Sequence, residues 1–368
     1  MNPKPLPALY GITKSNRNGD ELWGKNQFNS TFPTALCCYM RDKKIPAIYL
    51  KFIQDNNQLC VQSETLGFDE IFNTSFENKE LSFLFESKFE PYQQWAYGDI
   101  GNIDLVIKHE NNFLRALEIK LTVLPDDATH QDEQSKWGSE LVVRAATTSY
   151  AALGIADSCH DILPELRLLF EPVCQPIRNW GNPTEIKSRK NSILDCLDAF
   201  QAKYSSRQKP FLMQPIWKTK GKSPELCDDA FDVFVWSDFA LCRAFIERAR
   251  QENVKNSNKD NEVPRYLRAA SRLAHSLYDL SSREKVDMGV YREDAMGNLT
   301  DKEFALGGKI TRTYMSHPRK LKPAVPKEAL REIILGGGQD KLSPERCFDA
   351  TIYFTAKHLF EDIKNESD

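Results

Sequence analysis

The sequence predicts an α/β protein with a mixed central β-sheet flanked by helices, and with additional helices and loops in its C-terminal part. Three observations support this fold class. Short β-prone runs alternate along the chain with longer segments whose apolar residues recur at helical spacing. A predicted hairpin over residues 104–120 is followed by a helix and another strand, the order that an α/β core requires. The chain has 368 residues, 41% of them hydrophobic, and can therefore bury a large core.

The part of the chain before the hairpin contains two predicted strands between two predicted helices. We expect a short helix first, and then strands at residues 45–52 and 58–63, where β-prone side chains gather. Residues 77–89 carry apolar side chains at helical spacing, which predicts a helix that leads toward the hairpin.

The region after the hairpin continues the alternation. Ser139 is a favourable N-cap residue for a helix whose apolar positions extend to Leu153. The further elements expected are a strand at 166–170, a helix near 190–202, strands at 211–217 and 231–236, and a helix capped by Ser237.

A polar and helix-poor run over residues 251–263 predicts an exposed loop or boundary. Residues 1–250 would then form the α/β core with an N-terminal extension, and residues 264–368 a mostly helical C-terminal part. Within that part, three prolines indicate where helices begin, because proline is tolerated in the first turn. Pro264 opens a helix through Leu280, Pro326 opens one that ends at Gly336, and Ser343-Pro344 begins a last one.

The hairpin would bring two carboxylates and one lysine together. Its flanks are apolar, and residues 110–112 suit a three-residue turn. In that register Asp104 lies directly opposite Glu118, and opposed side chains of an antiparallel pair are about 4.5–5.5 Å apart. Lys120 follows Glu118 by two residues, so it lies on the same face of the strand.

Like charges placed side by side are destabilising unless a cation compensates them. Two carboxylates beside a lysine suit Mg²⁺, which binds through one or two carboxylates plus phosphate oxygens. Such a metal would polarise a phosphodiester and help to generate hydroxide, while Lys120 orients that water or neutralises charge. Two alternatives remain open: an edge strand with a charged exposed face shows the same pattern, and Asp99 is a rival for Asp104 as the first ligand.

These residues resemble the PD-(D/E)XK nuclease superfamily, with Ile103-Asp104 at the Pro-Asp position and Glu118-Ile119-Lys120 as the Glu-x-Lys motif. Ile103 departs from the proline of the motif, at a weakly constrained position. The stretches over residues 98–104 and 118–126 are similar to the HindVP-type group of type II restriction endonucleases.

This resemblance implies a restriction-endonuclease-like core and Mg²⁺-dependent cleavage of double-stranded DNA at a short palindromic site. It suggests a degenerate, GC-rich site of six base pairs. Because a palindrome is cut on both strands, two active sites related by a two-fold axis are needed, and we expect a homodimer. Glu86, in the predicted helix over residues 77–89, is a candidate for a further carboxylate of such a site, although a solvated helix face explains it equally well.

Two segments contain basic residues without acidic ones and are candidates for contact with DNA. They cover residues 203–222 and 309–327 and contain several Pro and Ser residues. Lysine and arginine contact phosphates and read guanine edges, but a solvated loop has the same composition. Arg144 and the Gly-rich run at 336–341 are further candidates, against a plain surface arginine and a helix C-cap. The candidate contacts are Arg144, Lys209, Lys218, Lys220, Lys222, Arg312, Arg319, Lys320, Gln339 and Lys341.

Other function classes are disfavoured by composition and motifs. The net charge of −3 argues against unspecific coating of nucleic acid, but it allows a local basic cleft. A phosphate loop before Lys222 would need glycine where the chain has Ile216, so we expect no nucleotide cofactor.

Cysteine usage and hydropathy predict where the protein works. The nine cysteines form no Cys-x-x-Cys pair, and no leader or membrane-spanning run is present, so we expect a soluble cytoplasmic protein that does not contact a membrane.

Two alternative functions stay open, namely a structure-specific repair or recombination nuclease and a DNA-binding relative that no longer cuts. A second Glu-x-Lys, Glu185-Ile186-Lys187, lacks an apolar strand around it and is not expected to act.

Overall fold

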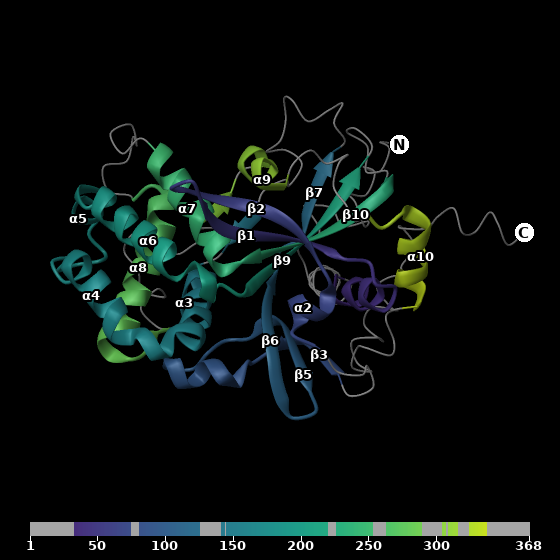
Figure 1. Ribbon diagram of the computed structural model, residues 1–368, viewed down its shortest axis with the longest axis horizontal. Helices are drawn as coiled ribbons and strands as arrows, with labels where there is room; N and C mark the ends of the chain where they lie inside the picture. Colours follow the sequence, from purple (N-terminus) through teal and green to yellow (C-terminus); the bar gives the residue numbers. More distant parts are fainter. Residues whose placement is uncertain are drawn as a thin grey trace, which may run out of the picture.

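The computed structural model describes most of the chain between residues 33 and 336 (Figure 1). The described residues are 33–74, 81–125, 141–143, 145–219, 226–252, 263–288, 304–306, 308–315 and 324–336. No helix in these ranges is both long and apolar enough to cross a membrane.

A mixed β-sheet of eight strands forms the centre of the fold, in the order β2-β1-β10-β9-β6-β5-β3, with β7 also paired to β9. The pairs β1/β10, β6/β9 and β7/β9 are parallel, and the other pairs are antiparallel. This arrangement confirms the predicted fold class. The strands are β1 (Ala47–Asp55), β2 (Gln58–Leu66), β3 (Leu81–Ser87), β5 (Ile103–His109), β6 (Asn112–Ile119), β7 (Thr122–Pro125), β9 (Pro210–Thr219) and β10 (Leu226–Ser237).

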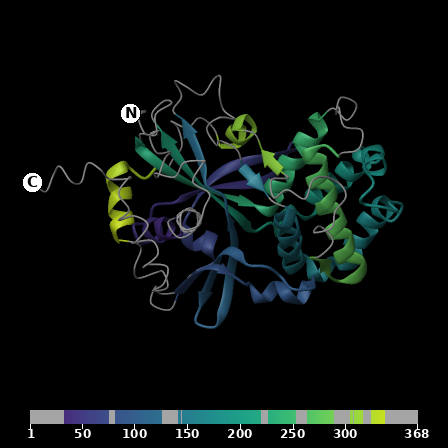
Figure 2. The ribbon, with the colours of Figure 1, turned by 180° about the vertical axis from the view of Figure 1, so that it is seen from behind.

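Helices cover both faces of this sheet (Figures 1 and 2). One face packs against a layer of five long helices, and the other packs against shorter helices near both ends of the described chain. The long helices are α3 (Ala145–Cys159), α4 (Leu163–Cys174), α6 (Lys190–Tyr204), α7 (Asp238–Gln251) and α8 (Arg265–Arg283). The other face is covered by a helix over residues 33–42, α2 (Phe68–Phe72) and α10 (Lys327–Gly336).

Alternation along the central strands explains why both faces are apolar. In β10, Phe234 and Trp236 point to the core under the long helices, whereas Phe231, Val233 and Val235 point to the opposite core. Successive side chains of a strand point to opposite faces, so a strand buried on both sides carries a nearly continuous apolar run.

Smaller elements complete the described fold. Two short two-stranded sheets join β4 (Ala96–Tyr97) to β11 (Val286–Asp287), and β8 (Leu141–Val143) to β12 (Phe304–Leu306). Short helices are η2 (Glu90–Trp95), η4 (His160–Ile162), α5 (Pro183–Ser188), η5 (Ser205–Arg207) and α9 (Gly308–Met315).

Most elements of the predicted sheet and helical layer are confirmed. The strands expected at 45–52, 58–63, 211–217 and 231–236 are β1, β2, β9 and β10, within a few residues at each end. Three of the predicted helix starts are also confirmed. The Ser237 side chain accepts a hydrogen bond from the Ala240 N–H at the start of α7, and Pro264 and Pro326 directly precede α8 and α10.

Two predicted elements, one before the hairpin and one after it, are wrong, because a short apolar run fits the spacing of a helix and that of a strand. Residues 166–170 belong to α4, where Leu166 and Phe170 are buried one turn apart while Leu168 is 76% exposed. The predicted helix over residues 77–89 is instead the strand β3, in which Leu81, Phe83 and Phe85 alternate into the core.

The helix expected from Ser139 begins later, at Ala145, because Leu141 and Val143 belong to β8. Ser139 itself, most of the run 251–263 and the helix at Ser343 lie outside the described residues. Helix α8, the first element of the predicted C-terminal part, packs in the same core as α3, α4 and α7.

The expectation that Lys218 contacts DNA is corrected, because this residue is only 5% exposed. Its Nζ lies 3.1 Å from Oδ2 of Asp232 on the neighbouring strand β10, so the two form a buried ion pair. Burial raises the pKa of Asp232 to about 7, against the opposing effect of the Lys218 charge. Within the sheet, Lys218 therefore neutralises an acid that would otherwise be unpaired.

Replacement of Lys218 by alanine should lower the free energy of unfolding by on the order of 3–5 kcal/mol at pH 8, because it leaves a buried carboxylate without its partner. The pKa of folded Asp232 lies above that of an unfolded aspartate, about 3.9. Protonation therefore stabilises the folded state at low pH, and this contribution is lost as the pH rises through about 7. The deficit of Lys218→Ala should consequently shrink between pH 8 and pH 5.

Urea unfolding of the variant at both pH values measures this difference. Lys51→Ala is the matched control, because the Lys51 side chain is half-exposed and lies 3.8 Å from Glu64 on the surface. This substitution should change the free energy of unfolding by no more than about 1 kcal/mol. A Lys218→Ala deficit that is equal at pH 5 and pH 8 would contradict the role given to Asp232.

Candidate active site

The β5–β6 hairpin has the predicted register at its base, but it reaches that register in another way. Its turn has two residues rather than three, because His109 pairs with Asn112, and Glu110 adopts a left-handed φ of 51°. A bulge then leaves Leu114 without an opposing residue, after which Leu105 faces Leu117. The extra residue in the bulge offsets the residue missing from the turn.

This register places Asp104 and Glu118 side by side, with Lys120 next to both. Lys120 Nζ lies 3.0 Å from Asp104 Oδ2, 3.0 Å from Glu118 Oε2 and 3.1 Å from the Ile119 carbonyl oxygen. The Ile119 N–H donates a second hydrogen bond to Asp104 Oδ2, at 2.8 Å. The ammonium group is thus surrounded by three oxygens that come from two strands.

The site is held in the middle of the sheet by the pairing of β6 with β9. Glu118 pairs with Leu212 in parallel register, and the Lys120 N–H donates to the Met213 carbonyl at 2.9 Å. Side-chain alternation then turns Glu118 toward the core below the long helices, where Val106 and Ala116 also lie, and Ile119 toward the opposite core. The face that the sequence left open as a charged edge is therefore largely buried.

Burial and charge act differently on the three groups. Burial raises the pKa of Glu118 to about 7, and the adjacent Asp104 adds to this effect while Lys120 opposes it. Burial also raises the pKa of Asp104, but Lys120 and the Ile119 N–H outweigh it, so that this pKa lies below its ordinary value. The two adjacent carboxyls therefore have pKa values that are shifted in opposite directions.

The oxygens around the Lys120 ammonium fit a hard divalent cation. Carboxylate and carbonyl oxygens are the ligands that Mg²⁺ and Ca²⁺ prefer. The three oxygens already surround one cation, the Lys120 ammonium. In the described ranges, no group of three or more His, Cys, Asp or Glu side chains is arranged as a metal site. A metal here would thus depend on two side chains, one main-chain oxygen and its substrate.

Glu86 and Asp99 lie near this site in the chain but differ from it in environment. Glu86 is opposite Asp104 in the β3–β5 pairing, since Phe85 pairs with Leu105, but it adopts a left-handed φ of 48° and its side chain is exposed. The prediction that a helix carries Glu86 is wrong, because Glu86 lies in the strand β3. Asp99 accepts a hydrogen bond from Lys88 Nζ at 2.6 Å and its side chain is 75% exposed, so Asp104 rather than Asp99 joins Glu118 and Lys120.

The basic segment over residues 203–222 faces acids that come from elsewhere in the sequence. Arg207 pairs with Asp161, and Lys209 Nζ lies 3.3 Å from Asp157 with a half-exposed side chain. Lys218 is buried, as described above. Arg312 lies in α9, but its side chain is not among those described. The other candidates lie outside the described residues: Arg144, Lys220, Lys222, Arg319, Lys320, Gln339 and Lys341.

Sequence reasoning missed polar groups that are placed among apolar positions. Gln214 on β9 donates to Thr122 Oγ1 at 2.7 Å and accepts from Trp236 Nε1 at 2.7 Å, and all three residues are buried. Tyr150 on α3 accepts a hydrogen bond from the main chain of Gly101, in the loop before Asp104. Neither residue belongs to a recognisable motif, and Tyr150 fits the apolar spacing of its helix.

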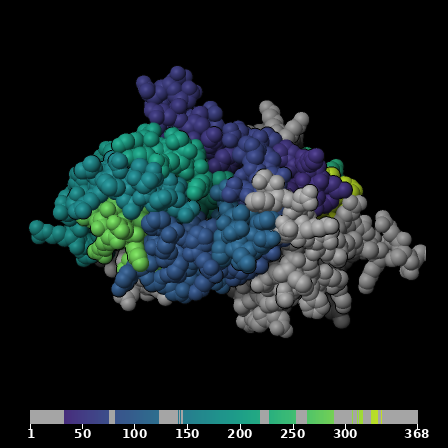
Figure 3. All heavy atoms as spheres, turned by 60° about the horizontal axis from the view of Figure 1, so that its bottom comes forward, coloured from purple at the N-terminus to yellow at the C-terminus, as the bar shows by residue number. Residues whose placement is uncertain are grey.

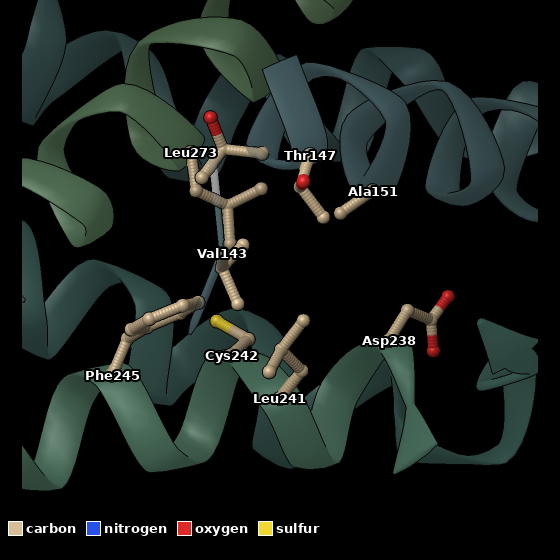
Figure 4. Close-up of a pocket in the computed structure, with 9 residues that line it drawn as sticks. Val143, Thr147, Ala151, Asp238, Leu241, Cys242, Phe245 and Leu273 are labelled. Carbon is tan, nitrogen blue, oxygen red and sulfur yellow. The ribbon is translucent and has the colours of Figure 1, made fainter. Parts of the chain in front are cut away.

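A small cavity between α3, α7 and α8 is distinct from this site (Figure 4). Its lining is mostly apolar, with Thr147, Thr148 and Asp238 as polar members, and it includes none of the hairpin residues. Asp238 is occupied at the start of α7, where its Oδ1 accepts hydrogen bonds from the Lys209 and Phe239 N–H groups. We therefore regard this cavity as a packing gap of the helical layer.

From the side of the hairpin, the blue surface of residues 81–125 lies next to the teal helical layer (Figure 3). Asp104 and Lys120 keep about 20% of their side chains exposed, whereas Glu118 keeps 9%. The site is thus partly open to solvent through Asp104 and Lys120.

Comparison with known proteins gives a consistent result over almost the full chain. Residues 23–360 match the HindVP restriction endonuclease family. The chain is 36% identical to the type II restriction enzyme HgiDI of Herpetosiphon aurantiacus, over 97% of this chain and 98% of that protein. It is 33% identical to the probable type II restriction enzyme HindVP of Haemophilus influenzae, over 96% and 94% of the two chains. No solved structure matches it significantly. The chain therefore belongs to the HindVP restriction endonuclease family.

Proposed function

We propose that this protein is a Mg²⁺-dependent type II restriction endonuclease that cuts both strands of DNA at a short palindromic site. One observation carries the chemical part of this proposal. The Lys120 ammonium lies 3.0 Å from both Asp104 and Glu118, at the point where the hairpin joins the centre of the sheet. The resemblance to the PD-(D/E)XK superfamily is part of the same proposal.

The three side chains take complementary roles. Asp104, Glu118 and the Ile119 carbonyl would hold Mg²⁺, which when bound supplies Lewis-acid activation of the phosphodiester and of the attacking water. Lys120 pairs with both carboxylates and offsets part of their charge in the absence of the metal, and in the complex it orients the water or stabilises charge on the phosphate. The Ile119 N–H fixes one Asp104 oxygen, which leaves the other oriented for a ligand.

The relatives and the symmetry of a palindrome support the proposal for the substrate and the assembly. We propose double-stranded DNA as the substrate, at a degenerate GC-rich site of six base pairs, and a homodimer whose two-fold axis matches that of the palindrome. None of the eight described cysteines forms a disulfide bond, in keeping with a protein of the reducing cytoplasm. The alternatives, a structure-specific nuclease and a non-cutting DNA binder, are outcomes of the first experiment below.

Incubation with plasmid DNA and Mg²⁺ should give discrete fragments, and EDTA should prevent their formation because two carboxylates and Lys120 alone cannot activate the water. Gel electrophoresis distinguishes the candidate functions. A smear or a preference for branched DNA would indicate a structure-specific nuclease, and binding without cutting would indicate an inactive relative. Cleavage that continues unchanged in EDTA would remove the metal from the mechanism.

Lys120→Ala and Glu118→Ala should each abolish detectable cleavage, a loss of at least about 10²–10³-fold in single-turnover rate, because each removes charge stabilisation at the reacting phosphate. DNA binding without Mg²⁺ should stay close to that of the unaltered protein in both variants, and thermal unfolding should stay close to normal in Glu118→Ala, which keeps the ion pair of Lys120 with Asp104. Lys120→Ala should melt at a lower temperature, because both carboxylates lose their partner, but it should remain folded at the assay temperature. Glu185→Ala is the matched control. Glu185 lies in the second Glu-x-Lys, and its carboxylate only accepts hydrogen bonds from the Arg178 and Asn179 N–H groups, so that variant should cut normally. Turnover at the unaltered rate in Lys120→Ala would rule out the proposed chemistry.

Light scattering after gel filtration should give about twice the mass of one 42.2 kDa chain, because one active site on each strand requires two copies. The measurement is made on the full chain, with and without a DNA duplex. A mass of one chain under both conditions would contradict the dimer while leaving the assignment of the active site intact.

A further inference from the structure

Tyr150 connects the helical layer to the loop that leads into the candidate active site. Its side chain lies on α3 and is buried, with 6% exposure. The hydroxyl oxygen accepts a hydrogen bond from the Gly101 N–H. Burial raises the pKa of Tyr150 to about 12, and the charges of Glu118 and Asp104 add to this effect.

The close approach of Tyr150 explains why residue 101 is glycine. A Cβ atom at this position would lie 2.6 Å from the Tyr150 hydroxyl oxygen, and the next nearest atom, the ring carbon Cζ, would be 3.9 Å away. Among the described glycines, only Gly98 has a positive φ, of 93°, and a Cβ there would meet nothing within 4 Å. Gly98 thus serves the backbone conformation, whereas Gly101 makes room for one hydroxyl group.

The loop over residues 98–102 is held at both ends, and its second end bears on Asp104. At the first end, Gln93 donates to the Gly98 carbonyl at 2.8 Å. At the second end, the Tyr150 hydroxyl binds Gly101, two residues before the start of β5 at Ile103 and three before Asp104. Movement of Gly101 would therefore be transmitted to the carboxylate that receives the Ile119 and Lys120 hydrogen bonds.

We propose that Tyr150 is a positioning residue, whose hydroxyl fixes the loop at Gly101 and thereby the Asp104 carboxylate. This inference rests on the proposed nuclease function. If Tyr150 only filled the core, phenylalanine would serve equally well, because the ring supplies the packing and the hydroxyl supplies only the bond to Gly101. The Tyr150→Phe variant therefore isolates the contact.

The test combines Tyr150→Phe, Gly101→Ala and the double variant in the full-length protein. Single-turnover cleavage with Mg²⁺ should slow about tenfold in Tyr150→Phe, while DNA affinity without Mg²⁺ and the melting temperature stay near their normal values. Gly101→Ala should slow cleavage more strongly than Tyr150→Phe does. In the Tyr150→Phe background, however, the added methyl group no longer meets the hydroxyl. There, Gly101→Ala should slow single-turnover cleavage less than threefold.

Hydrogen exchange supplies a readout that is independent of cleavage. The peptide over residues 98–104 should exchange faster in Tyr150→Phe, since the Gly101 N–H loses its acceptor. Tyr204→Phe is the matched control. Tyr204 is a buried tyrosine on α6 whose hydroxyl has no hydrogen-bond partner among the described residues, so its replacement should change neither cleavage nor exchange in this peptide.

Three results separate the possible failures. Normal cleavage and normal exchange in Tyr150→Phe would overturn the inference, while an inactive Lys120→Ala would still support the nuclease. If Gly101→Ala slowed cleavage by the same factor in the unaltered protein and in Tyr150→Phe, the inference would also be overturned, because the two residues would then act independently. If the unaltered protein cuts no DNA, the proposed function fails together with this inference.

Discussion

The parallel pairing of β6 with β9 is the constraint on which the rest of the site depends. A hairpin alone would leave its charged face on an edge strand, in water, where Asp104 and Glu118 would repel one another weakly. Instead, β9 places the end of β6 inside the sheet, with Glu118 beside Leu212 and the Lys120 N–H bonded to Met213. The same pairing presents this face to the core below α3, so the carboxylates lose most of their water.

Loss of water makes the ionised form of each carboxylate in the cluster less favourable. Two adjacent carboxylates in a partly buried place cannot both stay ionised without a positive charge nearby. The structure meets this demand with one ammonium shared by both acids: burial raises the pKa of Glu118 to about 7, while Lys120 and the Ile119 N–H hold that of Asp104 below its ordinary value. One lysine for two acids leaves the site short of positive charge, and a divalent cation would supply it. The Lys218–Asp232 pair elsewhere in the sheet is balanced one to one, which sets the hairpin cluster apart from a purely structural ion pair.

Local sequence pattern was enough to predict the sheet strands, the capped helices and the approach of Asp104 to Glu118. Those features depend on alternation over seven or more residues or on cap chemistry, as at Ser237. The pattern failed where apolar runs were short. Leu166 and Phe170 satisfy helical spacing, whereas Leu81, Phe83 and Phe85 satisfy strand spacing. The local pattern also could not identify partners that are distant in the sequence. The residues around Lys218 do not indicate that it pairs with Asp232, and those around Tyr150 do not indicate that it contacts Gly101. The turn was predicted with the wrong length, yet the register at Asp104 was right because the bulge at Leu114 compensates.

The most direct measurement is a crystal structure of the protein with a cognate DNA duplex and Ca²⁺, an ion that binds oxygen ligands at 2.3–2.6 Å. We expect a Ca²⁺ ion at that distance from the carboxylates of Asp104 and Glu118, with a DNA phosphate beside Lys120. An ion bound elsewhere, with the phosphates more than about 10 Å from these three residues, would contradict it, because direct electrostatic action on the reacting phosphate falls off over such a distance.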